Sequence, residues 1–213
     1  MRVKKIGHCC IVIEIDNKRI LFDPGAFSTG QEEERDICAV IITHEHEDHF
    51  HIGSLKKILA ANPQAIVVTN QSVGKLLEEN GIHYIKVEDS QSENVNGILI
   101  EGFGTVHALI YDLIPPVANT GYFIDNKFFF PGDAFYNPGK QVEVLALPVE
   151  GPWMKLSEAL DYLKLVKPVN CFNVHDGQIT PERATLLHKL PKDVSSQLGI
   201  NFTYLGEGES VEF

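Results

Sequence analysis

The chain contains 213 residues, of which 44% are hydrophobic and 22% are charged. This length and apolar content fit one domain over residues 1–213, or two fused half-domains that share a core, and they exclude an intrinsically disordered chain. The formal net charge is -11, and no Lys/Arg-rich patch with interleaved aromatic residues occurs. A chain of this charge repels polyanions, so we do not expect nucleic acid as a partner.

The four cysteines, Cys9, Cys10, Cys38 and Cys171, match no zinc-finger or disulfide spacing and lie in apolar, strand-like runs. We therefore expect buried free thiols in a reducing compartment. The basic N-terminus precedes an apolar run that acidic residues interrupt, which predicts a strand rather than a signal peptide. No run is long enough to span a bilayer. We expect a soluble, cytoplasmic protein with no membrane partner, and its oligomeric state is left open.

The first part of the chain alternates between apolar strands and amphipathic helices. Strands are predicted at 2–7, 10–15, 19–23, 36–42, 65–69 and 84–87, and helices at 52–60 and 72–79. Asp16-Asn17-Lys18 predicts a hairpin turn, and residues 26–36 predict a polar loop. Pro24 ends the third strand, and Gly25 permits an unusual backbone angle.

The second part predicts a similar set of elements. Residues 96–108 are expected to form two strands, with His107 closing the second. Further strands are predicted at 120–124, 127–130, 143–147, 169–174, 201–205 and 210–213, and helices at 155–166 and 181–189. The order of elements indicates an α/β fold with two similar halves, divided near residues 110–120 and packing their sheets between helices.

Residues 43–49 read Thr-His-Glu-His-Glu-Asp-His and follow the end of an apolar strand. Helical spacing would align His44 with Asp48 but turn His46 away. An extended segment instead places His44 and His46 on one side, and a turn then directs Asp48 and His49 elsewhere. This arrangement suits two neighbouring metal ions better than one. A solvated, charged loop is the alternative interpretation.

Three more residues with ligand side chains follow predicted strands: His107, Asp133 and His175. Strand ends that meet at one sheet edge are where α/β folds build their sites. An isolated histidine at a strand end is usually structural, but three such residues together with the 43–49 segment predict a metal centre.

With these landmarks in order along nearly the whole chain, the sequence resembles the metallo-β-lactamase superfamily. The match lies in residues 43–49, His107, Gly132-Asp133 and His175, with Leu-Phe-Asp-Pro-Gly at 21–25 upstream. The resemblance implies an αβ/βα four-layer sandwich with a two-metal site between its halves. The compact length, the Gly7-His8 opening and the Gly121-Tyr122 hairpin look most like the small lactonase-like hydrolases of the superfamily.

The resemblance also implies a role for each ligand residue. His44, His46 and His107 would bind one metal ion, Asp48, His49 and His175 would bind a second, and Asp133 would bridge them. The cofactors would be two divalent ions, with Zn²⁺ the default and Mn²⁺ or iron able to use the same ligands. Two such ions hold a hydroxide that attacks a carbonyl or phosphoryl group, and Asp48 could orient this nucleophile.

The sequence therefore predicts a metal-dependent hydrolase that acts on a small ester, lactone, amide or phosphoester. A metal-binding regulatory protein without turnover and a di-metal redox protein are the alternatives. Asp23 could accept a hydrogen bond from a metal-bound histidine or could simply cap a turn. The other residues that could line the site, each equally compatible with a packing role, are His8, Phe27, His51, Tyr136 and Trp153.

Overall fold

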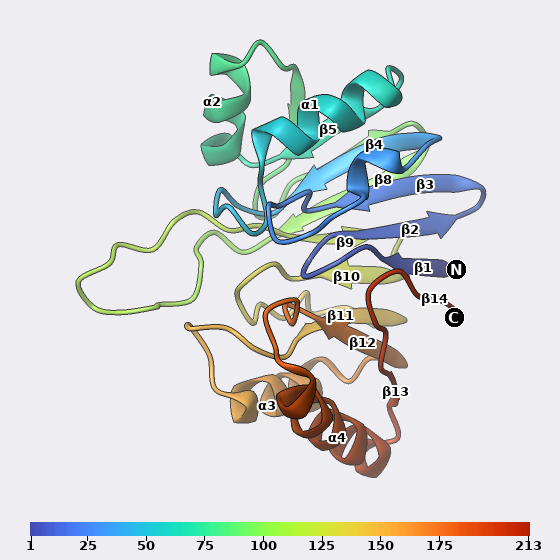
Figure 1. Ribbon diagram of the computed structural model, residues 1–213, viewed down its shortest axis with the longest axis vertical. Coiled ribbons are helices and arrows are strands. Elements are labelled where there is room, and N and C mark those ends of the chain that lie inside the picture. The colour runs from blue at the N-terminus through green and yellow to red at the C-terminus, as the bar shows by residue number, and fades with distance from the viewer.

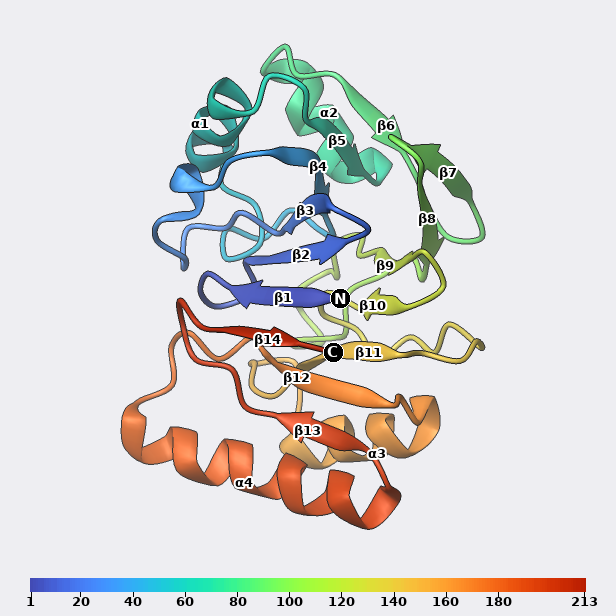
Figure 2. The ribbon, with the colours of Figure 1, turned by 90° about the vertical axis from the view of Figure 1, so that its right-hand side faces the viewer.

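The computed structural model describes residues 1–213, except for the side chains of Pro181 and Leu186. Two seven-stranded sheets pack face to face, and two helices cover the outer face of each sheet (Figure 1, Figure 2). The layers are helix, sheet, sheet and helix, which confirms the predicted αβ/βα four-layer sandwich. No helix among the described residues is both long and apolar enough to cross a membrane.

The first sheet has the strand order β14-β1-β2-β3-β4-β5-β6. Its strands are β1 (Arg2–Lys5), β2 (Ile11–Ile15), β3 (Lys18–Phe22), β4 (Ile37–Ile42), β5 (Ile66–Thr69), β6 (Tyr84–Lys86) and β14 (Ser210–Glu212). The β14–β1, β1–β2 and β2–β3 pairs are antiparallel, and the pairs from β3 to β6 are parallel. Asp16 and Asn17 form the β2–β3 turn with φ of 49° and 62°, as the hairpin signal predicted.

The second sheet repeats this plan with the strand order β13-β12-β11-β10-β9-β8-β7. Its strands are β7 (Ser92–Val95), β8 (Ile98–Phe103), β9 (Gly121–Ile124), β10 (Phe128–Phe130), β11 (Val144–Pro148), β12 (Asn170–Val174) and β13 (Asn201–Thr203). The pairs from β7 to β10 are antiparallel, and those from β10 to β13 are parallel. Four parallel strands form one side of each sheet, β3–β6 in the first and β10–β13 in the second. Their carboxyl ends share one edge of the molecule.

Helices α1 (Ile52–Ala61) and α2 (Gln71–Glu79) cover the first sheet, and α3 (Leu156–Val166) and α4 (Pro181–Leu198) cover the second (Figure 2). A short 3₁₀ helix, η1 (Gln31–Glu33), lies in the loop before β4. Between the sheets, Phe22 packs against Phe128 and Phe130 with ring centroids 5.5 and 5.1 Å apart. Burial of these rings contributes strongly to holding the two sheets together.

Glu34, which is 7% exposed, ties two strands to the loop that precedes β4. Its carboxylate accepts hydrogen bonds from Lys4 Nζ (2.7 Å) on β1 and Arg19 Nη2 (2.5 Å) on β3. Burial raises the pKa of Glu34, but these two bonds outweigh that effect, and the pKa lies below its ordinary value.

The structure corrects the prediction for residues 96–108. Asn96 and Gly97, with φ of 53° and 77°, form the turn between β7 and β8 instead of lying within a strand. An Asn-Gly pair favours this two-residue hairpin because both positions need positive φ. Strand β8 ends at Phe103, so His107 lies in the following loop and does not close a strand.

Two further boundaries differ from the sequence prediction. The chain changes sheets between β6 and β7, at residues 87–91, and β14 returns to the first sheet, so the predicted division near 110–120 does not mark the change of sheet. Helix α4 continues to Leu198 through Pro191, although the prediction ended it at Lys189. Pro191 is buried, and the packing of the helix outweighs the hydrogen bond that a proline removes.

Candidate metal centre

The seven predicted ligand residues come together at the edge where the parallel strands end. His44, His46, Asp48 and His49 follow β4, Asp133 follows β10, and His175 follows β12. His107 reaches the same place from the loop after β8. Each residue comes directly from, or a few residues after, a buried strand, so the sheets hold their backbones in place.

Asp133 lies at the middle of this group. Its Oδ2 atom is 3.1 Å from His175 Nε2, 3.4 Å from His107 Nε2 and 3.9 Å from His44 Nε2. Its Oδ1 atom is 3.3 Å from His49 Nε2. One buried carboxylate therefore faces histidines from both halves of the fold.

The remaining ligand atoms form overlapping groups around Asp133. The nitrogens of His44, His46 and His107 lie within 4.8 Å of one another, which is close enough to bind one cation. On the other side, Asp48 Oδ2 lies 3.4 Å from His175 Nε2 and 3.7 Å from His49 Nε2. His44 also lies within 4.8 Å of ligand atoms of Asp48 and His49, so the donors surround Asp133 without a sharp division.

These atoms fit a metal because none of them makes a hydrogen bond within the described structure. His44 Nε2, His49 Nε2, His107 Nε2 and Asp133 Oδ1 are buried and have no hydrogen-bond partner among the described residues. Leaving a buried polar atom unpaired costs about 1–3 kcal/mol. Cations bound at the point where these four atoms converge would give each of them a partner.

Asp23 fixes His49 from behind. Its carboxylate accepts hydrogen bonds from His49 Nδ1 (2.6 Å) and from the Thr43 N–H (2.8 Å) and hydroxyl (2.7 Å). Burial raises the pKa of Asp23 despite these three bonds. Because Nδ1 donates to Asp23, Nε2 is the His49 nitrogen that faces Asp133 and is available to a cation. Asp23 therefore orients a ligand as well as ending its strand.

Gly25 is required for a different reason from the one its position after Pro24 suggested. Its φ is not in the left-handed region, whereas Asp23 has φ of 41°. A Cβ at Gly25 would lie 1.8 Å from the Asp48 carbonyl oxygen. The loop after β3 thus lies so close to residues 43–49, here called the metal loop, that a residue with a Cβ atom cannot replace Gly25 without moving the backbone.

His8, in the loop between β1 and β2, contacts Asp48. Its Nδ1 accepts a hydrogen bond from the Gly177 N–H (3.1 Å), so the ring proton is on Nε2 and donates to Asp48 Oδ2 (3.2 Å). Burial lowers the pKa of His8 to about 4, which keeps the ring neutral. Hydrogen bonds from His175 and His8 outweigh burial at Asp48 and hold its pKa well below the usual range.

The charges at the centre are unevenly distributed. Burial lowers the pKa of His44 well below its ordinary value, and it lowers the pKa of His46 as well. Burial alone would also lower the pKa of His49 and of His175. The nearby Asp133 carboxylate outweighs this effect and raises both pKa values well above normal. Positive charge thus gathers on His49 and His175, whose protons a cation would displace.

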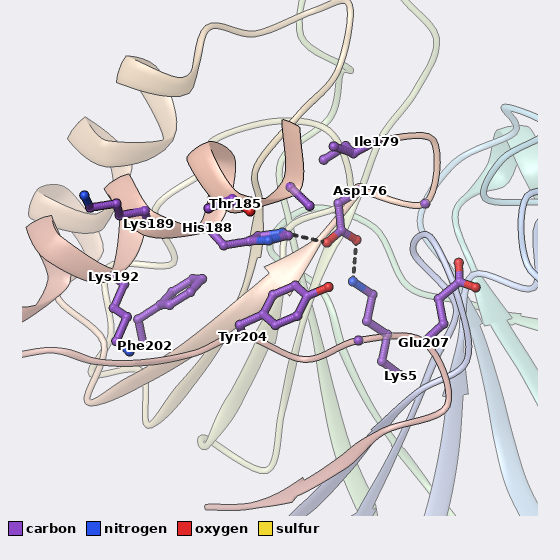
Figure 3. Close-up of a pocket in the computed structure, with 13 residues that line it drawn as sticks. Lys5, Asp176, Ile179, Thr185, His188, Lys189, Lys192, Phe202, Tyr204 and Glu207 are labelled. Atoms are coloured by element: carbon purple, nitrogen blue, oxygen red, sulfur yellow. Dashed lines mark hydrogen bonds and ion pairs between the residues drawn. The ribbon is translucent and has the colours of Figure 1, made fainter. Parts of the chain in front are cut away.

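The residue after His175 is held by a buried polar network (Figure 3). Lys5, which is 2% exposed, and His188 point at the Asp176 carboxylate, with His188 Nε2 3.1 Å from Oδ2. They outweigh burial and hold the pKa of Asp176 at about 2. The network borders a cavity of about 790 Å³ between α4 and the segment after β13. The polar network fixes Asp176 and so supports the left-handed backbone conformation of the preceding residue, His175, whose φ is 62°.

The structure places the remaining predicted lining residues in different roles. Trp153 lies beside two ligands, with its ring 5.9 Å from that of His107 and 6.0 Å from that of His175. Phe27 is 40% exposed and packs 5.6 Å from the His8 ring.

Two other candidates are structural. His51 caps α1 by accepting a hydrogen bond from the Ser54 N–H (3.3 Å). The Tyr136 hydroxyl accepts a hydrogen bond from the Val106 N–H (3.2 Å) and so braces the loop that carries His107. Neither side chain is hydrogen-bonded to a predicted ligand among the described residues.

Cys38 differs from expectation, because it is half-buried rather than buried. Cys9 is a buried free thiol as expected, and its sulfur lies within 4.8 Å of ligand atoms of His8, His49 and His175. Burial raises the pKa of Cys9, so the thiol is protonated. The only signal in the sequence was its position directly after His8.

The chain resembles known proteins in both sequence and structure. A family described as "Beta-lactamase superfamily domain" matches residues 2–175. Protein Rv0786c of Mycobacterium tuberculosis is 32% identical over 219 residues, covering 100% of both chains. A protein from Parabacteroides distasonis, named as a metal-dependent hydrolase, superposes with a TM-score of 0.78 at 20% identity, covering 97% of this chain and 93% of that one. Igni18, a metallo hydrolase from Ignicoccus hospitalis, gives 0.77 at 23% identity, covering 100% and 98%. The chain therefore belongs to the metallo-β-lactamase superfamily of metal-dependent hydrolases.

Proposed function

We propose that this metal-dependent hydrolase binds two divalent cations and cleaves a small ester, lactone, amide or phosphoester. The proposed ligands are His44, His46 and His107 for one cation, Asp48, His49 and His175 for the other, and Asp133 between them. Nitrogen and carboxylate donors in these numbers suit Zn²⁺, and Mn²⁺ and iron accept the same set. The observation that carries the proposal is the group of unpartnered buried ligand atoms that converge on Asp133.

Two bound cations would supply a hydroxide at neutral pH and neutralise negative charge on the reacting carbonyl or phosphoryl group. The protein's own residues then have separate tasks. Asp48, whose side chain is 19% exposed and thus reachable by solvent, accepts a hydrogen bond from the attacking water and orients it. Asp23 holds His49 in place, and the buried Trp153 excludes water beside His107 and His175.

We also propose that residues 1–213 act as one catalytic domain in a reducing, cytoplasmic environment. The sheet pairing of β14 with β1 supports a single domain because the last strand completes the sheet that the first strand begins. The four cysteines are unpaired within the described part of the chain, as expected for a reducing compartment.

Elemental analysis of protein purified without added metal, followed by a screen of esters, lactones and phosphodiesters, tests the proposal. Asp133→Ala and His46→Ala should lose bound metal and turnover together. Asp161→Ala and His83→Ala are matched controls at exposed sites and should retain both.

Turnover that persists in a metal-free Asp133→Ala protein would refute the mechanism. A screen that stays silent with fully metallated protein would instead identify a metal-binding regulatory protein. Iron content with a visible absorption band would identify a di-metal redox protein.

A further inference from the structure

Residues 108–117, here called the apolar loop, project from the body of the protein as the yellow-green segment at the left of Figure 1. Their sequence is Ala-Leu-Ile-Tyr-Asp-Leu-Ile-Pro-Pro-Val, in which Asp112 is the only charged residue. The large apolar side chains that solvent reaches are Leu109 (54% exposed), Tyr111 (59%), Leu113 (82%) and Ile114 (50%). Apolar side chains gathered in this way on a surface mark a place where something binds.

The base of the apolar loop is fixed to the metal centre. The His107 N–H donates to the Val117 carbonyl (2.9 Å), and the Ala108 N–H donates to the Asp133 carbonyl (2.8 Å). At the far end, the Ile114 N–H donates only within the loop, to the Tyr111 carbonyl. The loop therefore begins and ends beside two ligand residues and extends away from them.

A small hollow of about 10 Å³ lies between the loop and the ligands. It is lined by His46 and His107 together with apolar loop residues, among them Ile110, Ile114, Pro115 and Val117. A group bound at the first set of ligands would therefore have apolar side chains as its neighbours. A polar or charged substituent at this position would lose hydration without gaining a partner.

The occupant of the apolar loop follows from its place and its charge. The segment from Thr105 to Ala118 has no Lys or Arg, and the chain carries a net charge of -11, which disfavours docking on an anionic membrane surface. The loop residues that line the hollow instead lie beside His46 and His107. We propose that the apolar loop binds a hydrocarbon chain of the substrate, so that the protein acts on acyl esters or lactones with an alkyl substituent. This inference rests on the proposed hydrolysis at the metal centre.

The test uses metal-loaded protein and a series of straight-chain alkyl hydroxamates, from acetyl to decanoyl, whose head group binds metal and is not hydrolysed. Trp153 is the only tryptophan in the chain and lies beside His107 and His175, so its fluorescence reports binding. A fully buried methylene is worth about fourfold in affinity, so a half-buried chain should gain about twofold per methylene. The metal content after titration checks that the probe has not removed metal.

A double variant, Leu113→Ser with Ile114→Ser, should flatten this dependence on chain length. Leu165→Ser, a control on α3 at a residue that is 58% exposed, should keep the wild-type dependence.

Affinity that is equal along the hydroxamate series, or a chain-length dependence that the double variant retains, would overturn the inference. A wild-type dimer in sedimentation that the double variant splits would also overturn it, because the loop would then bind a second copy. Hydroxamate binding needs no turnover, so a chain-length effect in a protein that hydrolyses nothing would refute the proposed function and leave the loop's role intact.

Discussion

Replacing His8 with asparagine removes one hydrogen bond at the metal centre and keeps another. The asparagine carbonyl lies near the position of the histidine Nδ1 atom, so it still accepts from the Gly177 N–H. The donor at Nε2, which lies 3.2 Å from Asp48 Oδ2, is lost. A hydrogen bond to a charged group contributes about 1.5–3 kcal/mol, and the partly exposed Asp48 carboxylate favours the lower end of that range. The second cation should therefore bind about 10–30-fold more weakly.

Metal titration by calorimetry or by competition with a coloured chelator measures the two binding events separately. The His8→Asn protein should lose affinity for one equivalent and bind the other as the wild type does. His8→Gln is the matched variant because its terminal amide reaches the Nε2 position and can still donate to Asp48. It should bind both equivalents within a few-fold of the wild type. An unchanged His8→Asn protein, or one that loses both equivalents equally, would show that His8 does not position Asp48.

Three other substitutions test different parts of the structure. Asp23→Ala removes the acceptor that orients His49, so metal affinity in a chelator competition should fall about 10–100-fold. Gly25→Ala would place a methyl carbon 1.8 Å from the backbone of Asp48, so the metal loop must move; denaturant titration should show a loss of about 3 kcal/mol or more, and elemental analysis should show loss of metal. Glu34→Gln should cost about 1–2 kcal/mol of unfolding free energy at neutral pH. The folded-state pKa of Glu34 is lowered, so this stabilisation is present above the unfolded pKa of about 4.3 and disappears as the pH falls below it.

Each of these expectations has an opposite outcome that would contradict it. A metal affinity that Asp23→Ala leaves intact would reduce Asp23 to a turn-capping residue. Normal stability and metal content in Gly25→Ala would mean that the two loops do not approach as closely as described. A stability difference between wild type and Glu34→Gln that persists at acidic pH would show that the charge of Glu34 is not its cause.

Many elements were predictable because their signals are local. The strand before residues 43–49 is a continuous apolar run, and the Asp16-Asn17 turn has the residues that positive φ requires. Helix α1 showed apolar residues at helical spacing. Where a local signal was overlooked or overridden, the prediction was wrong: Asn96-Gly97 was placed inside a strand, and Pro191 lies within α4 because packing there outweighs local preference.

The sequence by itself determined which residues offer side chains suited to a metal, because ligand type and the alternation of side chains along an extended segment are local properties. Only the tertiary structure decided what surrounds them. The contact of His8 with Asp48 joins residues 40 positions apart, and its contact with Gly177 joins residues 169 apart. Such pairs depend on which strands lie side by side, and strand order is set by the burial of whole sheets rather than by any short segment. The same holds for Cys9, for the support of His175 by Asp176, and for the exposed apolar loop beside His107.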